Sequence, residues 1–236
     1  MKPYVSILTP TYNRRKFINA AIAMYKAQTY PKDRMEWIII DDGTDKVADL
    51  FAQASKTIPN IRYFSLSEKL LIGQKRNLLN DKAKGDIMIA MDDDDYYPPE
   101  RVAHVVTRFI QQPSVQLAGS SEMYLYFRTD GKIIKAGPYN PNHCTNGTMA
   151  YRRAYMLTHR YDEKQTHAEE KSFLDDYKNP MIQLDPFKTI LVMCHSDNTF
   201  DKNGLRDAQN PMLKDTALTL KTFVKEKALR DFFTSC

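Results

Sequence analysis

The amino-acid sequence predicts an α/β protein with a mostly parallel central sheet flanked by helices. Short, continuously apolar segments alternate with amphipathic segments over the first half of the chain. Continuous apolar strands are typical of parallel sheets that helices cover on both faces, because neither face of such a strand meets water. Polar clusters follow three of these segments, as expected at the ligand-binding edge of an open α/β sheet.

The composition is that of a soluble globular domain. The 236 residues are 42% hydrophobic and 27% charged. No apolar run approaches the roughly 18 residues of a transmembrane segment, and the stretch before Pro10 is too short for a signal-peptide core. The net charge of +5 comes from scattered lysines and arginines, so no nucleic-acid partner is expected. The three cysteines form no CxxC pair, which favours a reducing, cytoplasmic location.

The first half of the chain divides into four strand–helix units. The segment that begins at Phe17 has apolar residues at the 3.6-residue period of a helix. Gly85 follows another such segment as a stop signal, and Pro99 suits the first turn of the next helix. Asp45 is expected to cap the second helix. The expected strands are Val5–Thr9, Trp37–Ile40, Ile61–Phe64 and Ile87–Met91, and the expected helices are Phe17–Gln28, Val47–Ala54, Gly73–Lys84 and Pro98–Gln112.

Three polar clusters follow the predicted strands directly. They cover Pro10–Arg14, Asp41–Asp45 and Asp92–Asp95. Because the carboxyl ends of parallel strands meet at one edge of the sheet, we expect the three clusters to converge there. This expectation does not depend on any known family.

The second half has a different pattern. Met123–Arg128 and Lys132–Ala136 flank Asp130-Gly131, which is a strong hairpin signal. Thr148–Tyr151 is expected to return to the sheet, and helices are expected near Glu169–Tyr177 and Met212–Phe223. This half therefore reads as mixed α+β and should supply the second wall of a cleft.

The four consecutive aspartates from Asp92 to Asp95 predict a cation-binding site. Two unit charges about 4 Å apart repel by about 4 kcal/mol at an effective dielectric constant of 20. A solvated loop would relieve part of this repulsion, but the run begins where a buried strand ends. Carboxylate oxygens favour Mg²⁺ or Mn²⁺. Alternation along an extended chain puts Asp92 and Asp94 on one side, so that the pair can hold one ion.

Four blocks in order carry a family resemblance. They read VSILTPTYNR, IIIDDGTD, a helix with GQKRN and AKGD, and IAMDDDDYYPPERV. Together they resemble family 2 glycosyltransferases of the GT-A fold, over roughly residues 3–200. The resemblance implies a Rossmann-like sheet, a nucleotide-diphosphate sugar donor and, for most members, a divalent metal and an inverting reaction.

The resemblance also implies roles on the donor side. The first nucleotide-contacting loop of the family is matched by Pro10, Thr11, Tyr12 and Arg14. Asp42 matches the residue that accepts a hydrogen bond from the edge of the base, and Arg76 matches a basic residue near the nucleotide or diphosphate. Asp92 and Asp94 match the DxD motif, with Asp94 the favoured metal ligand and Asp93 an alternative contact to the ribose. Structural alternatives are that Tyr12 packs on the sheet end, Asp42 shapes a turn and Arg76 is a surface charge.

An inverting transfer needs a carboxylate that takes the acceptor's proton. The family places it at the start of a helix in the second half, where this chain has Glu169-Glu170. Register assigns the base to Glu170, although the family usually has Asp there. The alternatives are a charged first turn stabilised by the helix dipole, or the pair Asp175-Asp176. His195 matches a third metal ligand or a diphosphate donor, with a structural histidine as the alternative.

The predicted protein is a single GT-A domain over residues 1–236. Residues 1–115 form its nucleotide-binding half, 116–200 its acceptor-binding half and 201–236 a helical extension that covers the site, docks on the core or forms a homodimer. The predicted function is Mn²⁺- or Mg²⁺-dependent, inverting transfer from a UDP-sugar, with GDP- and dTDP-sugars open, to a hydroxyl acceptor such as a glycan. The alternatives are a sugar-phosphate nucleotidyltransferase, disfavoured because TPTYNR lacks glycine, and a non-catalytic nucleotide-binding module.

Overall fold

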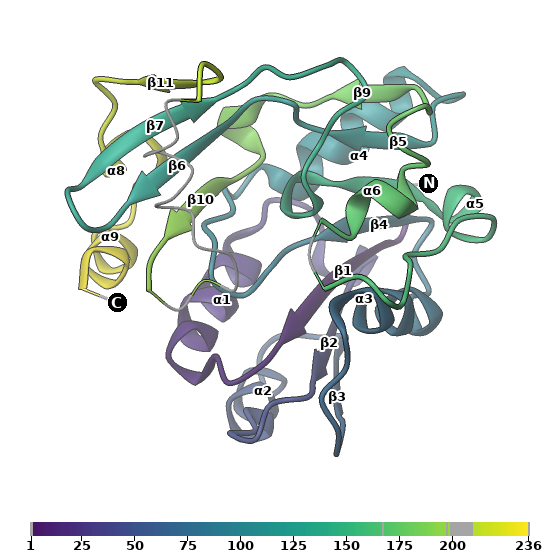
Figure 1. Ribbon diagram of the computed structural model, residues 1–236. Coiled ribbons are helices and arrows are strands. Elements are labelled where there is room, and N and C mark those ends of the chain that lie inside the picture. Colours follow the sequence, from purple (N-terminus) through teal and green to yellow (C-terminus); the bar gives the residue numbers. More distant parts are fainter. Residues whose placement is uncertain (1, 167, 197, 199–209, 236) are drawn as a thin grey trace.

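The computed structural model describes residues 2–166, 168–196, 198 and 210–235. Two sheets organise them, one of seven strands in the order β3-β2-β1-β4-β8-β5-β9 and one of four in the order β10-β6-β7-β11 (Figure 1). The smaller sheet lies at the upper left of Figure 1, beside the C-terminal helix α9. The predicted α/β class is therefore confirmed.

The first four strands are parallel, as predicted. They are β1 (Val5–Thr11), β2 (Met35–Asp41), β3 (Ile61–Ser65) and β4 (Ile87–Ala90). All seven residues of β2 are buried, because its neighbours β1 and β3 cover both edges and helices cover both faces. The helices between and after these strands are α1 (Arg15–Ala27), η1 (Lys32–Arg34), α2 (Ala48–Ala54), α3 (Ile72–Lys82) and α4 (Arg101–Gln111).

The two faces of the large sheet have separate apolar cores. On one face Trp37 stacks on Tyr25 of α1, with ring centroids 4.6 Å apart, and meets Phe51 of α2 edge-on. On the other face Ile38 packs in the cluster that contains Leu79 of α3. Neighbouring residues of β2 thus serve opposite cores, which is why its sequence is continuously apolar.

The second half of the chain contributes strands to both sheets. In the large sheet, β8 (Ala150–Arg152) pairs antiparallel with β4 and with β5 (Leu117–Gly119), and β9 (Met181–Gln183) pairs parallel with β5. The predicted return of residues 148–151 to the sheet is confirmed. Since three strands from residues 116–200 belong to the first sheet, the proposed division at residue 115 stays a prediction.

The predicted hairpin forms the middle of the small sheet. It consists of β6 (Met123–Phe127) and β7 (Lys132–Ala136), and Gly131 has the positive φ of 69° that its turn requires. β10 (Leu191–Cys194) pairs parallel with β6, and β11 (Leu213–Asp215) pairs antiparallel with β7.

Two predicted helices are wrong in extent. In place of a helix over 169–177, α6 (Glu170–Phe173) is one turn long, because Asp175, Asp176 and Tyr177 all have positive φ. In place of a helix over 212–223, the chain forms β11 and then α8 (Leu220–Phe223). Pairing with β7, far away in the sequence, satisfies the backbone of β11 and overrides its local helical pattern. The remaining helical turns are α5 (Arg153–Met156), η2 (Asn146–Thr148) and η3 (Pro186–Lys188).

The described part of the C-terminal extension docks on the core. In α9 (Lys227–Ser235), Phe233 meets Tyr96 and Phe232 meets Phe17 edge-on, with ring centroids 6.2 and 6.0 Å apart. Residues 201–209 and 236 of the predicted extension lie outside the described part of the chain.

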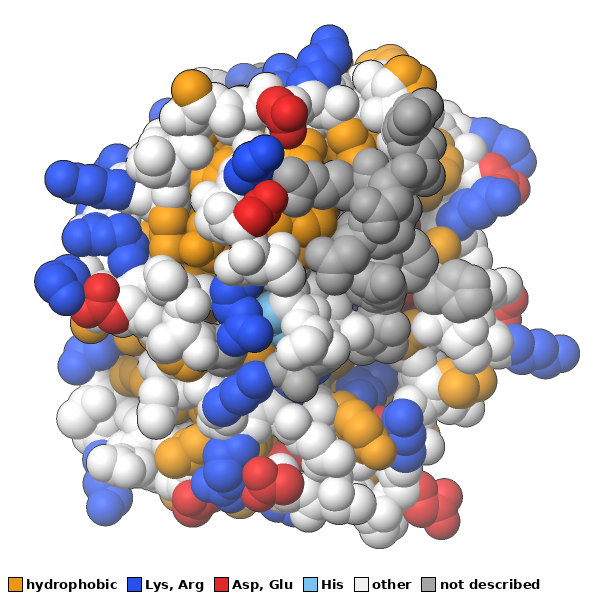
Figure 2. Space-filling view, turned by 60° about the vertical axis from the view of Figure 1, so that its left-hand side comes forward, with side chains coloured by type: hydrophobic (Ala, Val, Ile, Leu, Met, Phe, Trp, Pro, Cys, Tyr) orange, Lys and Arg blue, Asp and Glu red, His pale blue; other side chains and the backbone are white. Residues whose placement is uncertain are grey.

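Within the described residues, no helix combines the length and the apolar content that crossing a bilayer requires. Figure 2 shows lysine and arginine side chains spread around an apolar area of the surface.

Candidate functional site

The three polar clusters meet at the carboxyl ends of β1, β2 and β4, as predicted. The side-chain oxygen of Asn13 accepts hydrogen bonds from the backbone N–H groups of Thr44 and Asp45, at 2.7 and 2.9 Å, and so joins the first cluster to the second. Arg14 Nη2 lies 3.5 Å from Asp94 Oδ2 and joins the first cluster to the third. Asn13 has a φ of 54°, which asparagine tolerates better than most residues.

The first loop places Tyr12 beside two lysines. The ammonium groups of Lys69 and Lys75 lie 4.3 and 5.7 Å from the centroid of its ring. Pro10 and Thr11 are the last residues of β1, and the buried hydroxyl of Thr11 has no hydrogen-bond partner among the residues that the structure describes. This loop therefore offers an aromatic face and an unsatisfied polar atom at the sheet edge.

The second loop depends on two buried carboxylates. Asp41 accepts from the backbone N–H groups of Gly43 and Val47. Val47, rather than Asp45, is the N-cap residue of α2, so the predicted cap is wrong. Asp42 forms an ion pair with Lys75 and accepts from the N–H of Leu70 at 2.8 Å.

The acidic run alternates as predicted. Asp93 and Asp95 are buried, whereas Asp92 and Asp94 are half-buried. Asp95 accepts from the backbone N–H of Met193 at 2.8 Å. Within the described residues, one oxygen of Asp93 has no hydrogen-bond partner. Burial, followed by the charge of Asp94, raises the pKa of this carboxyl well above its ordinary value.

Asp94 faces a histidine from the end of β10. His195 Nε2 lies 3.6 Å from Asp94 Oδ2, and the amide nitrogen of Asn198 lies 3.4 Å from the same oxygen. Asp92 instead pairs with Arg76. Within the described residues, no group of three or more His, Cys, Asp or Glu side chains could hold a metal ion. Of the predicted ligands, the structure thus brings Asp94 and His195 together and directs Asp92 elsewhere.

Arg76 connects the acidic run to the second half of the chain. Its guanidinium lies 2.7 Å from Asp92 Oδ1 and 3.2 Å from Glu169 Oε1. With its amide oxygen turned toward Arg76, Asn146 accepts from the same guanidinium at 2.8 Å and donates to Tyr161. Burial alone would lower the pKa of Arg76, but Asp92 and Glu169 outweigh it and raise that pKa well above its ordinary value.

Glu170 begins α6 beside this ion-pair chain. Burial, followed by the charge of Glu169, raises the pKa of its carboxyl to about 7. The charge of Glu170 in turn contributes to raising the pKa values of Cys144 and Tyr177, for which burial is the main cause. In the described part of the chain no ion pair holds Glu170, in contrast to Glu169. Its carboxyl is suited to proton transfer near neutral pH.

Two side chains of this region, Lys75 and Asn198, are missing from the predicted site residues, whereas Asp41 belongs to the predicted cluster Asp41–Asp45 and Asn146 to the segment 144–148 expected to line the acceptor site. Lys75 adjoins Arg76 in the GQKRN block, and this adjacency was the available signal for it. Asn198 meets Asp94, which is 104 residues away in the sequence, so no local pattern predicts this contact.

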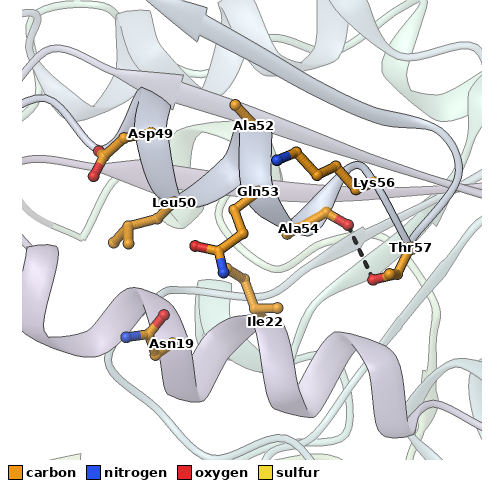
Figure 3. A pocket seen from close by; sticks show the side chains of 9 residues that line it. All are labelled: Asn19, Ile22, Asp49, Leu50, Ala52, Gln53, Ala54, Lys56 and Thr57. Atoms are coloured by element: carbon orange, nitrogen blue, oxygen red, sulfur yellow. Dashed lines mark hydrogen bonds between the residues drawn. The ribbon is translucent and has the colours of Figure 1, made fainter.

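A groove of roughly 610 Å³ lies elsewhere, between α1 and α2 (Figure 3). Asn19 and Ile22 line one side, and Gln53, Lys56 and Thr57 line the other. None of the predicted site residues lines this groove, so it forms no part of the candidate site.

Comparison with known proteins agrees with the geometry. The model of glycosyl transferase family 2 matches residues 6–160. A putative teichuronic acid biosynthesis glycosyltransferase, TuaG of Bacillus subtilis, is 31% identical over 102 residues, which are 43% of this chain and 40% of the relative. Chondroitin synthase of Escherichia coli is 25% identical over 213 residues, 84% of this chain and 30% of that protein. The chain thus spans less than half the length of these two curated relatives.

Solved structures share the fold. The mannosyltransferase PcManGT from Pyrobaculum calidifontis, in complex with GDP-Man and Mn²⁺, has a TM-score of 0.66 at 16% identity, over 84% of this chain and 59% of its own. TarS of Staphylococcus aureus, residues 1–349 in complex with UDP-GlcNAc, has a TM-score of 0.63 at 17% identity, over 83% of this chain and 60% of its own.

The sheet order and these likenesses define a protein of the GT-A fold. Since the family model covers about two thirds of the sequence, the chain belongs to glycosyl transferase family 2. The resemblance carried by the four sequence blocks is confirmed.

Removing the central guanidinium should destabilise the protein strongly. Arg76→Met would leave Asp92 and Glu169 without their shared cation in a buried setting, and we expect the free energy of unfolding to fall by about 3–5 kcal/mol. Urea denaturation measures this change. Arg160→Met is the matched control, because it breaks an exposed pair with Asp81 and should cost at most about 1 kcal/mol. Equal losses in the two variants would contradict a structural role for Arg76.

Proposed function

We propose that this protein is a metal-dependent, inverting glycosyltransferase that moves a sugar from a nucleotide-diphosphate donor, with UDP favoured, to a hydroxyl acceptor such as a glycan. Family membership and the nucleotide sugars bound by the related structures support this proposal. The observation that carries it is the bridge of Arg76, which joins the acidic run on the donor side to the carboxylates at the start of α6.

On the donor side, the proposal assigns the nucleotide to the edge formed by the first two loops. The base would lie against Tyr12, where Asp42 and Lys75 form a buried ion pair. Pro10, Thr11 and Arg14 would border the nucleotide, and Asp93 would meet the ribose with its unpartnered oxygen. Arg76 would act on the donor side by holding Asp92 in place.

The donor set fits a hard divalent cation, Mn²⁺ or Mg²⁺. Two ligand atoms that each lie about 2.1 Å from one ion can be 3.6 Å apart, the separation of Asp94 Oδ2 and His195 Nε2. Mg²⁺ is commonly held by one or two protein side chains, with substrate phosphates and waters as further ligands. When bound, such an ion neutralises the negative charge of the leaving diphosphate.

On the acceptor side, Glu170 would act as general base. Its carboxylate takes the proton of the acceptor hydroxyl while that oxygen bonds to the anomeric carbon. The bond from that carbon to the diphosphate oxygen breaks on the opposite face, and the diphosphate leaves with the electron pair. The configuration at the anomeric carbon is thereby inverted. Glu169 and Arg76 hold the start of α6 in position for this step.

The cytoplasmic location and the homodimer stay predictions.

Replacing the proposed base should slow the chemical step without weakening donor binding. Glu170→Gln keeps the shape but cannot take a proton, so we expect kcat to fall by about 10²–10⁴-fold. The dissociation constant of UDP, measured calorimetrically, should stay within about twofold of the parent value, because the nucleotide lies on other loops. Glu122→Gln, on the β5–β6 connection, is the control, because this carboxylate pairs with Lys135 and has no place in the proposed site. Transfer at the parent rate by the Glu170 variant would exclude this base.

The pH profile should show the titration of Glu170. A general base works only when deprotonated, so kcat/KM should fall about tenfold per pH unit below its pKa. That pKa is raised to about 7 by burial and by Glu169. The fall should therefore begin near neutral pH on the acid side. Initial rates at saturating metal measure the profile. The same inflection in the residual activity of Glu170→Gln would assign it to another group.

Loss of Asp94 should remove the effect of the metal on nucleotide binding. A ligand at 100 times its dissociation constant stabilises the folded state by about 2.7 kcal/mol, so UDP with Mn²⁺ should raise the melting temperature of the parent protein. In Asp94→Ala, adding Mn²⁺ should give little further shift beyond that of UDP alone. Asp231→Ala, an exposed carboxylate on α9, should behave like the parent. An undiminished effect of Mn²⁺ in the Asp94 variant would refute this ligand.

A further inference from the structure

Three aromatic side chains form a row in the second half of the chain. The ring of His143 lies 4.7 Å from that of Tyr139 and 4.9 Å from that of Tyr177, measured between ring centroids. His143 therefore stands between two tyrosines that come from segments far apart in the sequence. Tyr139, His143 and Tyr177 together are the aromatic row.

The segment that carries Tyr139 and His143 is fixed to the large sheet. Gln183, the last residue of β9, donates from its amide nitrogen to the carbonyl oxygens of Pro141 and His143, at 2.6 and 3.3 Å. The backbone N–H of Tyr139 donates to the carbonyl oxygen of Ser121 at 3.1 Å. The protein itself thus holds both rings in position.

Tyr177 belongs to a strained turn. Asp175, Asp176 and Tyr177 have φ values of 49°, 53° and 60°, in the left-handed region that is unfavourable for a residue with a Cβ atom. Such conformations persist where the surrounding structure requires them, and they cluster at functional sites. Tyr177 packs against the apolar cluster that contains Phe173 of α6. The turn therefore keeps Tyr177 close to the helix that begins with Glu170.

The outer end of the aromatic row is exposed and uncharged. Tyr139 is 38% exposed. Within the described residues, Nδ1 of His143 is buried without a hydrogen-bond partner, and burial lowers the pKa of this imidazole, so the middle ring is neutral at neutral pH. An exposed tyrosine offers an apolar ring face with a hydroxyl group at its edge. A pyranose ring has the complementary form, with C–H groups on its face and hydroxyl groups at its rim.

We propose that Tyr139 binds a sugar ring of an extended glycan acceptor, beyond the sugar unit whose hydroxyl group faces Glu170. Tyr177 is the member of the row close to α6, whereas Tyr139 contacts His143 at the far end. A sugar on Tyr139 is therefore separated from the base by the unit that reacts. The inference rests on the proposed function, and it specifies the acceptor as an oligosaccharide of at least two units.

Sugars with equatorial hydroxyl groups are the appropriate probes. In β-linked glucose and N-acetylglucosamine, the substituents lie at the rim, so both ring faces carry only C–H groups and can lie flat on an aromatic ring. The probes are methyl β-glucoside and cellotetraose, together with methyl β-N-acetylglucosaminide and chitotetraose. Calorimetry with UDP and Mn²⁺ present measures their dissociation constants.

The variants are Tyr139→Ala and Tyr139→Phe, with Phe187→Ala as the matched control. Phe187 is 43% exposed and belongs to a different aromatic cluster, with Tyr124 and Phe223. In Tyr139→Ala, the tetrasaccharide of at least one series should bind about 3–10-fold less tightly, as expected for the loss of one aromatic contact. The monosaccharide of that series should stay within about twofold of the parent value. Tyr139→Phe and Phe187→Ala should bind both as the parent does.

Three results would overturn the inference. The first is an equal loss of affinity for monosaccharide and tetrasaccharide in Tyr139→Ala, which would give the ring no role beyond the reacting unit. The second is the same length-dependent loss in Phe187→Ala. The third is a parent protein that binds UDP but neither tetrasaccharide, which leaves the proposed glycosyl transfer intact. A parent protein that binds neither UDP nor any saccharide would refute the proposed function as well.

A measurement on the parent protein covers the case in which Tyr139→Ala does not fold. In saturation-transfer NMR with UDP and Mg²⁺, irradiation of the tyrosine ring protons should transfer magnetisation chiefly to the C–H protons on one face of a single unit of the bound tetrasaccharide. This pattern is expected because a stacked sugar turns one face to the ring. Uniform transfer to all units would refute stacking on Tyr139 without any variant.

Discussion

Four adjacent carboxylates at the end of a buried strand must each find a partner, and much of the candidate site follows from how they do so. At an effective dielectric constant of 20, two such charges about 4 Å apart repel by about 4 kcal/mol. The structure separates them by alternation. Asp92 forms an ion pair with Arg76, and Asp94 lies beside Arg14 and His195. Asp95 accepts a hydrogen bond from the backbone of β10. Among the described residues, one buried oxygen of Asp93 has no hydrogen-bond partner. The acidic run therefore draws together segments from the whole chain.

Arg76 shows how this requirement couples the two halves of the protein. Its guanidinium is buried between Asp92 and Glu169, which are 77 residues apart in the sequence. Both carboxylates are therefore oriented by the same side chain. The neighbouring Glu170 has no ion-pair partner among the described residues, and burial, followed by the charge of Glu169, raises its pKa to about 7. Two adjacent glutamates thus acquire different properties, one as part of an ion pair and one as a group suited to proton transfer.

The second buried pair, Lys75 with Asp42, lies at the carboxyl ends of β1 and β2. A buried lysine beside a buried aspartate contributes little net stability compared with apolar residues of similar size, but it holds both side chains in one arrangement. In both pairs the chain uses a buried ion pair to orient a polar group. Since Lys75 and Arg76 are successive residues of α3, they point to different parts of the site from the same helical turn.

The sequence alone determined the parallel strands, most helices of the first half, the hairpin around Gly131 and the convergence of three polar clusters. These features depend on local periodicity, on turn chemistry and on the rule that carboxyl ends of parallel strands share an edge. Only the tertiary structure decided that the helix at 170 ends after one turn, that residues 213–215 form a strand, and which partner each charged side chain meets. Arg76 and Glu169 are 93 residues apart, and Asp94 and Asn198 are 104 apart, so no local pattern encodes these contacts. They form because burial makes an unpaired charge costly, and the fold determines which counter-charge is within reach.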